Sequence, residues 1–157
     1  MRHGIADDAG PANGFQDAHR SLTPEGAKRM AVQARGLAAL KLGPVDVLLS
    51  SPLLRCAQTA GIVGGALGLE PVIEERLSPG ARFEEIAEIL DDHPDADRVW
   101  ACGHQPDLSY ITLDLTGGLV EFRKGGVAVI ELDGVRRGGG CLQALFTPAS
   151  LRAMGSA

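Results

Sequence analysis

Cysteine is scarce in this sequence, and its few cysteines lie far apart. The chain has three, Cys56, Cys102 and Cys141. Disulfide frameworks and structural zinc sites both need several cysteines at short, regular spacings. We therefore expect reduced thiols, no bound metal and a cytoplasmic protein.

Long apolar runs and an excess of positive charge are also missing. The longest apolar runs, such as residues 45–49, are far shorter than the roughly 20 residues needed to cross a bilayer. The net charge of −5 argues against a general surface for nucleic acids. We expect neither a membrane nor a nucleic-acid partner, so any anion site must use a few focused cations.

The composition is that of one globular domain, which we expect to span residues 1–157. Hydrophobic residues make up 45% of the chain and charged residues 22%. These proportions are typical of a folded domain, and a chain of this length buries a substantial core.

Local signals alternate between helices and strands along this domain. Thr23-Pro24-Glu25 predicts a helix start, because threonine caps free amides and proline suits the first turn. An apolar stripe continues that helix to about residue 42. A loop over residues 5–21 is expected before that helix. Further helices are expected over residues 51–68, 83–90 and 106–115, and another is expected from residue 148. Strands are expected over residues 45–50, 71–73, 97–103, 125–132 and 141–146.

This alternation predicts an α/β sandwich with a mainly parallel sheet. In such sheets, ligands bind beyond the carboxyl ends of the strands. Arg2, His3, Arg55 and His104 all lie at element boundaries. Two arginines and two histidines at one rim suit a tetrahedral anion, because arginine binds two oxygens at once and histidine serves as nucleophile or donor.

Three motifs resemble the histidine phosphatase superfamily, which includes cofactor-dependent phosphoglycerate mutase. They are Arg2-His3-Gly4, Ser51-Pro52 with Arg55 and Thr59, and Gly103-His104. Short length and the stretches at residues 20–26, 77–80 and 104–106 resemble its SixA-type phosphohistidine phosphatase branch. The resemblance spans roughly residues 2–148. It implies a three-layer α/β/α sandwich of the phosphoglycerate mutase-like type, with a mainly parallel central sheet.

The resemblance also implies a metal-independent phosphatase in which His3 forms a transient phosphohistidine. Arg2, Arg55 and His104 would bind the phosphoryl oxygens, and the carbonyl of Gly4 would hold the other ring nitrogen of His3. Arg20 matches a position that lines the substrate groove. No metal or other cofactor is implied, because the arginines supply the positive charge.

The proton donor is left open by the sequence. Gln105 stands where one branch of the superfamily has an aspartate, and Glu74 and Glu75 match the mutase-like pattern poorly. Without a strong acid, a phosphohistidine or another phosphoramidate is favoured, because a protonated imidazole leaves as a neutral group. The expected partner is a phosphorelay protein that carries phosphohistidine. The alternatives are a small-molecule phosphatase, a phosphomutase and a non-catalytic binding module.

Another departure from the family lies at the start of the chain. The family places a central strand directly before the Arg-His pair, whereas this sequence begins at Met1. A missing central strand would leave rows of backbone groups unpaired. We expect either residues upstream of Met1 or another segment to fill that position.

Overall fold

The computed structural model describes residues 1–156 and contains two groups of paired strands. Three strands form a parallel sheet in the order β2-β1-β3, and β4 pairs with β5 in antiparallel fashion. The strands are β1 (Val47–Ser50), β2 (Val72–Ile73), β3 (Val99–Cys102), β4 (Val127–Leu132) and β5 (Gly140–Phe146). The helices are α1 (Pro24–Ala39), α2 (Leu54–Leu67), α3 (Phe83–Asp91), α4 (Asp107–Thr116) and α5 (Pro148–Gly155).

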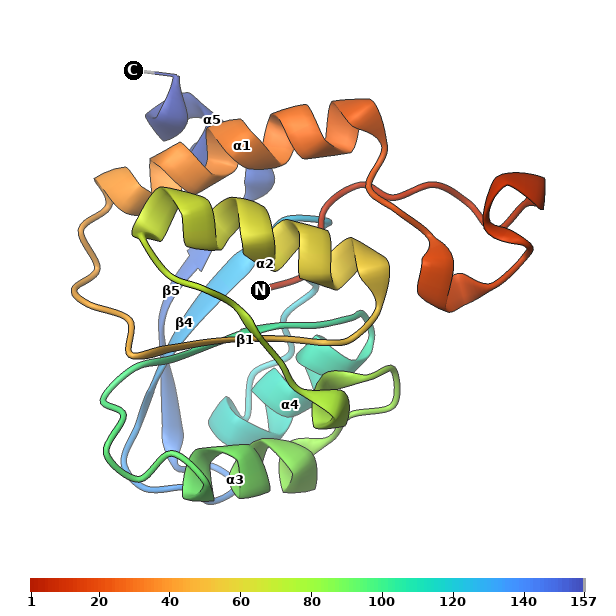
Figure 1. The fold of residues 1–157 in the computed structure, drawn as a ribbon. Helices are drawn as coiled ribbons and strands as arrows, with labels where there is room; N and C mark the ends of the chain where they lie inside the picture. Colours follow the sequence, from red (N-terminus) through yellow and green to blue (C-terminus); the bar gives the residue numbers. More distant parts are fainter. Residues whose placement is uncertain (157) are drawn as a thin grey trace.

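Helices cover both faces of the strands. In Figure 1, α1, α2 and α5 lie on one side of the strands, and α3 and α4 lie on the other. α1 packs against both α2 and α5. The predicted three-layer α/β/α sandwich is therefore confirmed. Across residues 1–156, none of the helices combines the length and the apolarity that crossing a lipid bilayer requires.

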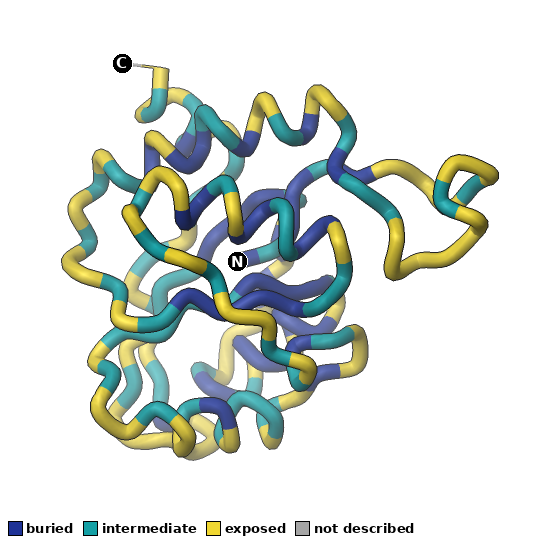
Figure 2. Tube along the Cα trace, in the orientation of Figure 1, coloured by how far each residue is buried: buried dark blue, intermediate teal, exposed yellow. Residues whose placement is uncertain are grey.

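The hydrophobic core lies on both sides of the parallel strands. The larger cluster includes Met30, Val63 and Leu151, which come from α1, α2 and α5. A smaller cluster joins Leu49 of β1 to Ile89 of α3. Full burial of such a side chain contributes about 1.5–3 kcal/mol. Figure 2 shows the buried segments at the centre of the molecule, with the loop over residues 5–21 projecting as a largely exposed arm.

The first three residues join the two groups of strands. The Gly103 amide donates to the Met1 carbonyl over 3.0 Å, and the His3 amide donates to the Gly103 carbonyl over 3.2 Å. On the other side, the Arg2 amide donates to the Gly126 carbonyl over 3.0 Å. These residues therefore occupy the sheet position expected for the central strand. The expectation of residues upstream of Met1 stays a prediction.

The helix starts follow the local chemistry, with one correction. α1 begins at Pro24 as predicted, and the Thr23 hydroxyl accepts from the Gly26 amide over 2.8 Å. α2 was expected from Ser51 but begins at Leu54. The reason is that the amide of Ser51 still pairs with the Cys102 carbonyl of β3, over 3.0 Å. The Ser51 hydroxyl also bonds outside the helix, with the Nε2 of His104.

A glycine allows the close approach of α1 and α5. A Cβ built on Gly36 would lie 2.1 Å from the Leu151 carbonyl oxygen, which forces the backbones apart. We expect Gly36→Ala to lower the free energy of unfolding by about 1–3 kcal/mol, as in other overpacked cores. Urea unfolding followed by circular dichroism measures this change.

Gly61→Ala in α2 is the matched control, because a Cβ there meets nothing within 4 Å. Alanine at an unstrained position stabilises by about 0.4–1 kcal/mol through the unfolded state. If both variants unfold at the same urea concentration, the packing argument for Gly36 is wrong.

Candidate active site

The ring of His3 is held by its own backbone. Its Nδ1 lies 2.7 Å from the carbonyl oxygen of Gly4, the contact that the resemblance implied. The Gly4 amide donates to the Thr59 hydroxyl over 3.0 Å, and that hydroxyl donates to the Arg55 carbonyl over 2.6 Å. With the proton on Nδ1, the Nε2 of His3 carries the lone pair, which accepts a hydrogen bond from the Nε of Arg55.

Arg55 lies between the two predicted histidines. It is in the first turn of α2, where it is buried although charged. Its Nε lies 3.3 Å from the Nε2 of His3, and its Nη2 lies 3.3 Å from the Nδ1 of His104. The two imidazole rings are 5.5 Å apart between centroids. The fold thus gathers three of the predicted residues into one cluster.

His104 lies two residues beyond the end of β3, and its ring contacts Ser51, which follows β1, and Cys56 of α2. Its Nε2 lies 2.8 Å from the Ser51 hydroxyl and 3.6 Å from the Cys56 thiol. A hydrogen bond with Cys102 and burial both raise the pKa of the Cys56 thiol. Cys56 is therefore a neutral packing residue beneath the cluster, rather than a reactive thiolate.

Arg2 brings a second guanidinium to the cluster. Its Nη1 donates to the Phe122 carbonyl over 2.7 Å. Its Nε is buried and has no hydrogen-bond partner within residues 1–156. Burial lowers the pKa of Arg2, but from so high a starting value that the group stays charged near pH 7. A half-buried cation whose buried Nε donor is unpaired is suited to receiving an anion.

Burial keeps both histidines of the cluster neutral near pH 7. Burial, assisted by Arg55, lowers the pKa of His3 to about 3, although the Gly4 carbonyl acts in the opposite direction. Burial and Arg55 likewise lower the pKa of His104 to about 4, against the attraction of Asp107 and Asp17. A neutral imidazole with a free lone pair is the nucleophilic form of histidine.

The loop over residues 5–21 adds a carboxylate that the sequence did not single out. Asp17 accepts from the Nη2 of Arg55 over 2.9 Å and from the Nη1 of Arg20 over 2.8 Å. Partial burial opposes its ionisation, but the two arginines outweigh this and lower the pKa of Asp17. Arg20, predicted to bind substrate, thus reaches the cluster through Asp17, with no direct contact to either histidine among the described residues.

The two glutamates considered as proton donors lie elsewhere. Glu74 accepts from the backbone amide, Nε and Nη2 of Arg76, the last over 2.7 Å, and this pairing lowers the pKa of Glu74. Among the described residues, neither Glu74 nor Glu75 hydrogen-bonds to the cluster. Nor do residues 1–156 contain a group of three or more His, Cys, Asp and Glu side chains suited to a metal ion.

This arrangement of two guanidiniums and two neutral imidazoles is suited to a phosphoryl group. A family model described as "Histidine phosphatase superfamily (branch 1)" matches residues 1–107, more than half of the chain. The chain belongs to the histidine phosphatase superfamily. The recognition made from the motifs is therefore confirmed. No curated protein sequence matches this member of the superfamily.

Solved structures place the chain near one group within the histidine phosphatase superfamily. The protein histidine phosphatase SixA, complexed with tungstate, is 26% identical, with a TM-score of 0.83 and coverage of 96% of both chains. A candidate phosphohistidine phosphatase SixA from Agrobacterium tumefaciens is 25% identical, with a TM-score of 0.78 and coverage of 94% of this chain and 95% of that chain. Another from Nakamurella multipartitia is 26% identical, with a TM-score of 0.76 and coverage of 94% and 93%.

The contact between Asp17 and Arg55 generates a prediction about anion binding. An entering anion must share Arg55 with the Asp17 carboxylate, so we expect Asp17→Asn to bind tungstate roughly two- to fivefold more tightly. That range corresponds to about 0.5–1 kcal/mol, the scale of a half-exposed ion pair. Isothermal titration calorimetry at fixed ionic strength measures the change.

Asp8→Asn is the matched control, because Asp8 is on the same loop and lies 4.0 Å from Arg20 without touching Arg55. It removes the same charge, so it reports the general electrostatic effect alone. Weaker tungstate binding in Asp17→Asn would show that Asp17 positions Arg55 for the anion instead of competing with it.

Proposed function

We propose that this protein is a phosphohydrolase that forms a phosphohistidine on His3 and removes phosphate from phosphohistidine in another protein. The observation that carries the proposal is the state of His3. Its ring is neutral, its Nδ1 is anchored on Gly4, and its Nε2 faces Arg55. This is a nucleophile already oriented next to a fixed positive charge.

In the first step, the Nε2 lone pair of His3 attacks the phosphorus of the substrate. The bond from phosphorus to the leaving imidazole breaks, and that imidazole takes the electron pair and departs neutral because its other nitrogen carries a proton. Arg2, Arg55 and His104 hold the phosphoryl oxygens as charge spreads over them. Arg55 exchanges its contacts with His3 and Asp17 for contacts with these oxygens.

In the second step, a water molecule attacks the phosphorus of phosphorylated His3. The bond between Nε2 and phosphorus breaks, its electron pair returns to the ring, and the oxygen and both protons of the water end on the released phosphate, as dihydrogen phosphate. The Gly4 carbonyl keeps Nδ1 protonated throughout, so the ring leaves as a neutral group. His3 is then in the state in which it began.

Within residues 1–156, no unpaired carboxyl group hydrogen-bonds to the cluster, and this supports a phosphoramidate substrate over an alkyl phosphate ester. An alkoxide needs a proton donor to leave, whereas a protonated imidazole does not. Among residues 1–156, the carboxylate bonded to the cluster is Asp17, whose pKa is lowered by its arginine partners. The proposed substrate also agrees with the name of the protein histidine phosphatase SixA, which is 26% identical to this chain.

Trapping tests this proposal directly. The protein is mixed with a phosphohistidine donor, quenched in base and mapped by mass spectrometry. We expect phosphate on His3 that disappears as the donor is consumed. His3→Ala abolishes the label, and His104→Ala lowers turnover roughly 10²–10³-fold, as for loss of one transition-state donor.

His93→Ala is the matched control, because His93 follows the end of α3, a helix that lies on the opposite side of the strands from α2 (Figure 1). It should keep both label and turnover. Tight tungstate binding without any label would favour the non-catalytic binding module. Fast turnover of alkyl phosphates, with little on phosphohistidine, would favour a small-molecule phosphatase.

The lowered pKa values generate a second test, by pH. Because His3 and His104 titrate at about 3 and about 4 in the folded protein, their ring signals should stay constant in NMR spectra from pH 8 to 5. In the unfolded chain both rings take up protons near pH 6.5. The unfolded state therefore binds more protons below that pH, and stability falls as the pH drops from about 7 towards 4.

His3→Asn and His104→Asn assign the two signals and remove their share of the pH dependence. Urea denaturation midpoints at several pH values provide the second readout. A His3 signal that titrates near pH 6.5 in the folded protein would contradict the neutral nucleophile.

A further inference from the structure

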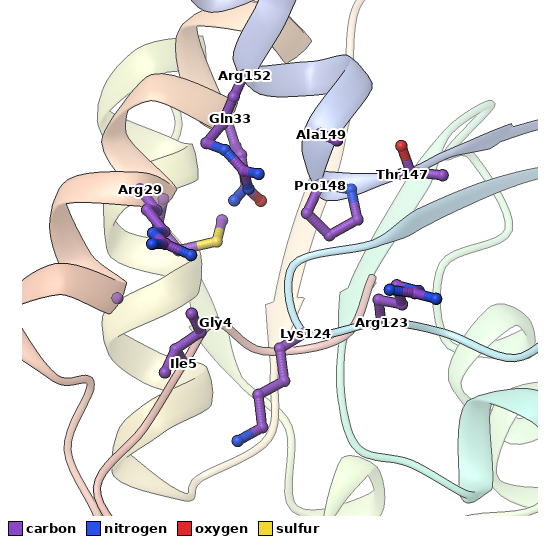
Figure 3. A pocket seen from close by; sticks show the side chains of 12 residues that line it. Gly4, Ile5, Arg29, Gln33, Arg123, Lys124, Thr147, Pro148, Ala149 and Arg152 are labelled. Atoms are coloured by element: carbon purple, nitrogen blue, oxygen red, sulfur yellow. The ribbon is translucent and has the colours of Figure 1, made fainter.

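A cavity of about 560 Å³ lies outside the cluster just described, on the other side of the segment that carries His3. It is bounded by α1, by the first turn of α5 and by the loop that precedes β4. Figure 3 shows Arg29, Gln33 and Arg152 on one side of this cavity, with Arg123 and Lys124 on the other. We propose that it is a second anion site, which binds a small organic phosphate.

The charge of the cavity wall is the main support. Four lining side chains are cationic, namely Arg29, Arg123, Lys124 and Arg152, and none of the lining residues is acidic. Glu25 neutralises Arg29 in part, over 2.6 Å. Within residues 1–156, the other three cations form no salt bridge. Three cations without a salt-bridge partner around one cavity attract a multiply charged anion, even in a chain of net charge −5.

An unsatisfied polar group supports a ligand independently of charge. Gln33 is only 3% exposed and lines the cavity, yet its Oε1 has no hydrogen-bond partner within residues 1–156. Buried amide groups normally have partners, and one that lacks them costs about 1–3 kcal/mol. The Oε1 is itself fully buried against Gly125, so a ligand hydroxyl or amine would satisfy this group once the Gln33 amide turns towards the cavity.

The apolar part of the cavity wall indicates that the ligand has an organic group in addition to its phosphate. Ile5, Met30 and Pro148 line the cavity with apolar surface. The first turn of α5 adds the positive end of a helix dipole, which favours phosphate oxygens. A volume of about 560 Å³ lies within the range of small-molecule sites. A small organic phosphate fits both kinds of lining, because its phosphate oxygens can bind the arginines while its organic group contacts the apolar residues.

The cavity also touches the residue that anchors the nucleophile. Gly4 lines it, and a Cβ on Gly4 would lie 2.7 Å from the Cγ of Met30, so the two residues are in close contact. The carbonyl of the same Gly4 holds the Nδ1 of His3. A ligand in this cavity would therefore lie next to the residue that supports the His3 ring. Binding itself does not depend on the catalysis proposed above.

Titration of the full chain with adenosine 5′-monophosphate, followed by amide NMR shifts and calorimetry, tests the proposal. His3→Ala is the background, so that the probe is not turned over. We expect shifts at Arg29, Gln33, Lys124 and Ala149. In this background, the double substitution Arg123→Gln and Arg152→Gln should weaken this binding roughly tenfold or more, because two charge-assisted contacts are lost.

The matched control is the double substitution Lys28→Gln and Lys41→Gln, which removes the same charge at exposed positions outside the cavity. It should leave the affinity within about twofold. Equal weakening in both double variants, or shifts confined to Arg55 and His104, would overturn the second site. Inorganic phosphate that binds this site as tightly as the nucleotide would overturn the organic part of the proposal.

Discussion

Backbone hydrogen bonds on both sides of residues 1–3 are the constraint on which the site depends. Gly103 donates to Met1 and accepts from His3, while Gly126 accepts from Arg2. Because His104 follows Gly103 directly, the bonds that close the sheet also set the spacing of the two imidazoles. Both histidines lie directly next to hydrogen-bonded sheet residues, so the backbone of the sheet fixes the distance between their rings.

Burial sets the protonation states of the two arginines and two histidines, and it also costs free energy because charged groups lose water. Removing two guanidiniums and two imidazoles from water disfavours every charged form. The arginines stay charged because their pKa is so high, whereas the histidines become neutral. Asp17 offsets part of the desolvation cost of Arg55 in this structure, because the Asp17 carbonyl and carboxylate accept hydrogen bonds from the Arg55 guanidinium. In the proposed reaction, a substrate phosphoryl group would take the place of the Asp17 carboxylate, so that Arg55 keeps an anionic partner.

The sequence predicted a structural feature correctly where the interactions that produce it are between neighbouring residues. The Thr23 cap and Pro24 predicted the start of α1, because both act on amides within one helical turn. The start of α2 was misplaced by three residues, because Ser51 is engaged by Cys102 and His104, which are distant in sequence. Asp17 was missed for the same reason, since an aspartate three residues before an arginine carries no sign that it reaches α2.

The sequence by itself determined the order of helices and strands and the family, and it predicted the four residues that we propose hold the phosphoryl group. Periodicity, caps and short motifs are properties of neighbouring residues, so they can be read without coordinates. Only the tertiary structure decided that Glu74 is paired with Arg76, that the two histidines of the cluster are neutral, and that four cations line the cavity between α1 and α5. Pairing, burial and cavity shape arise between segments far apart in the chain, and folding alone brings those segments together.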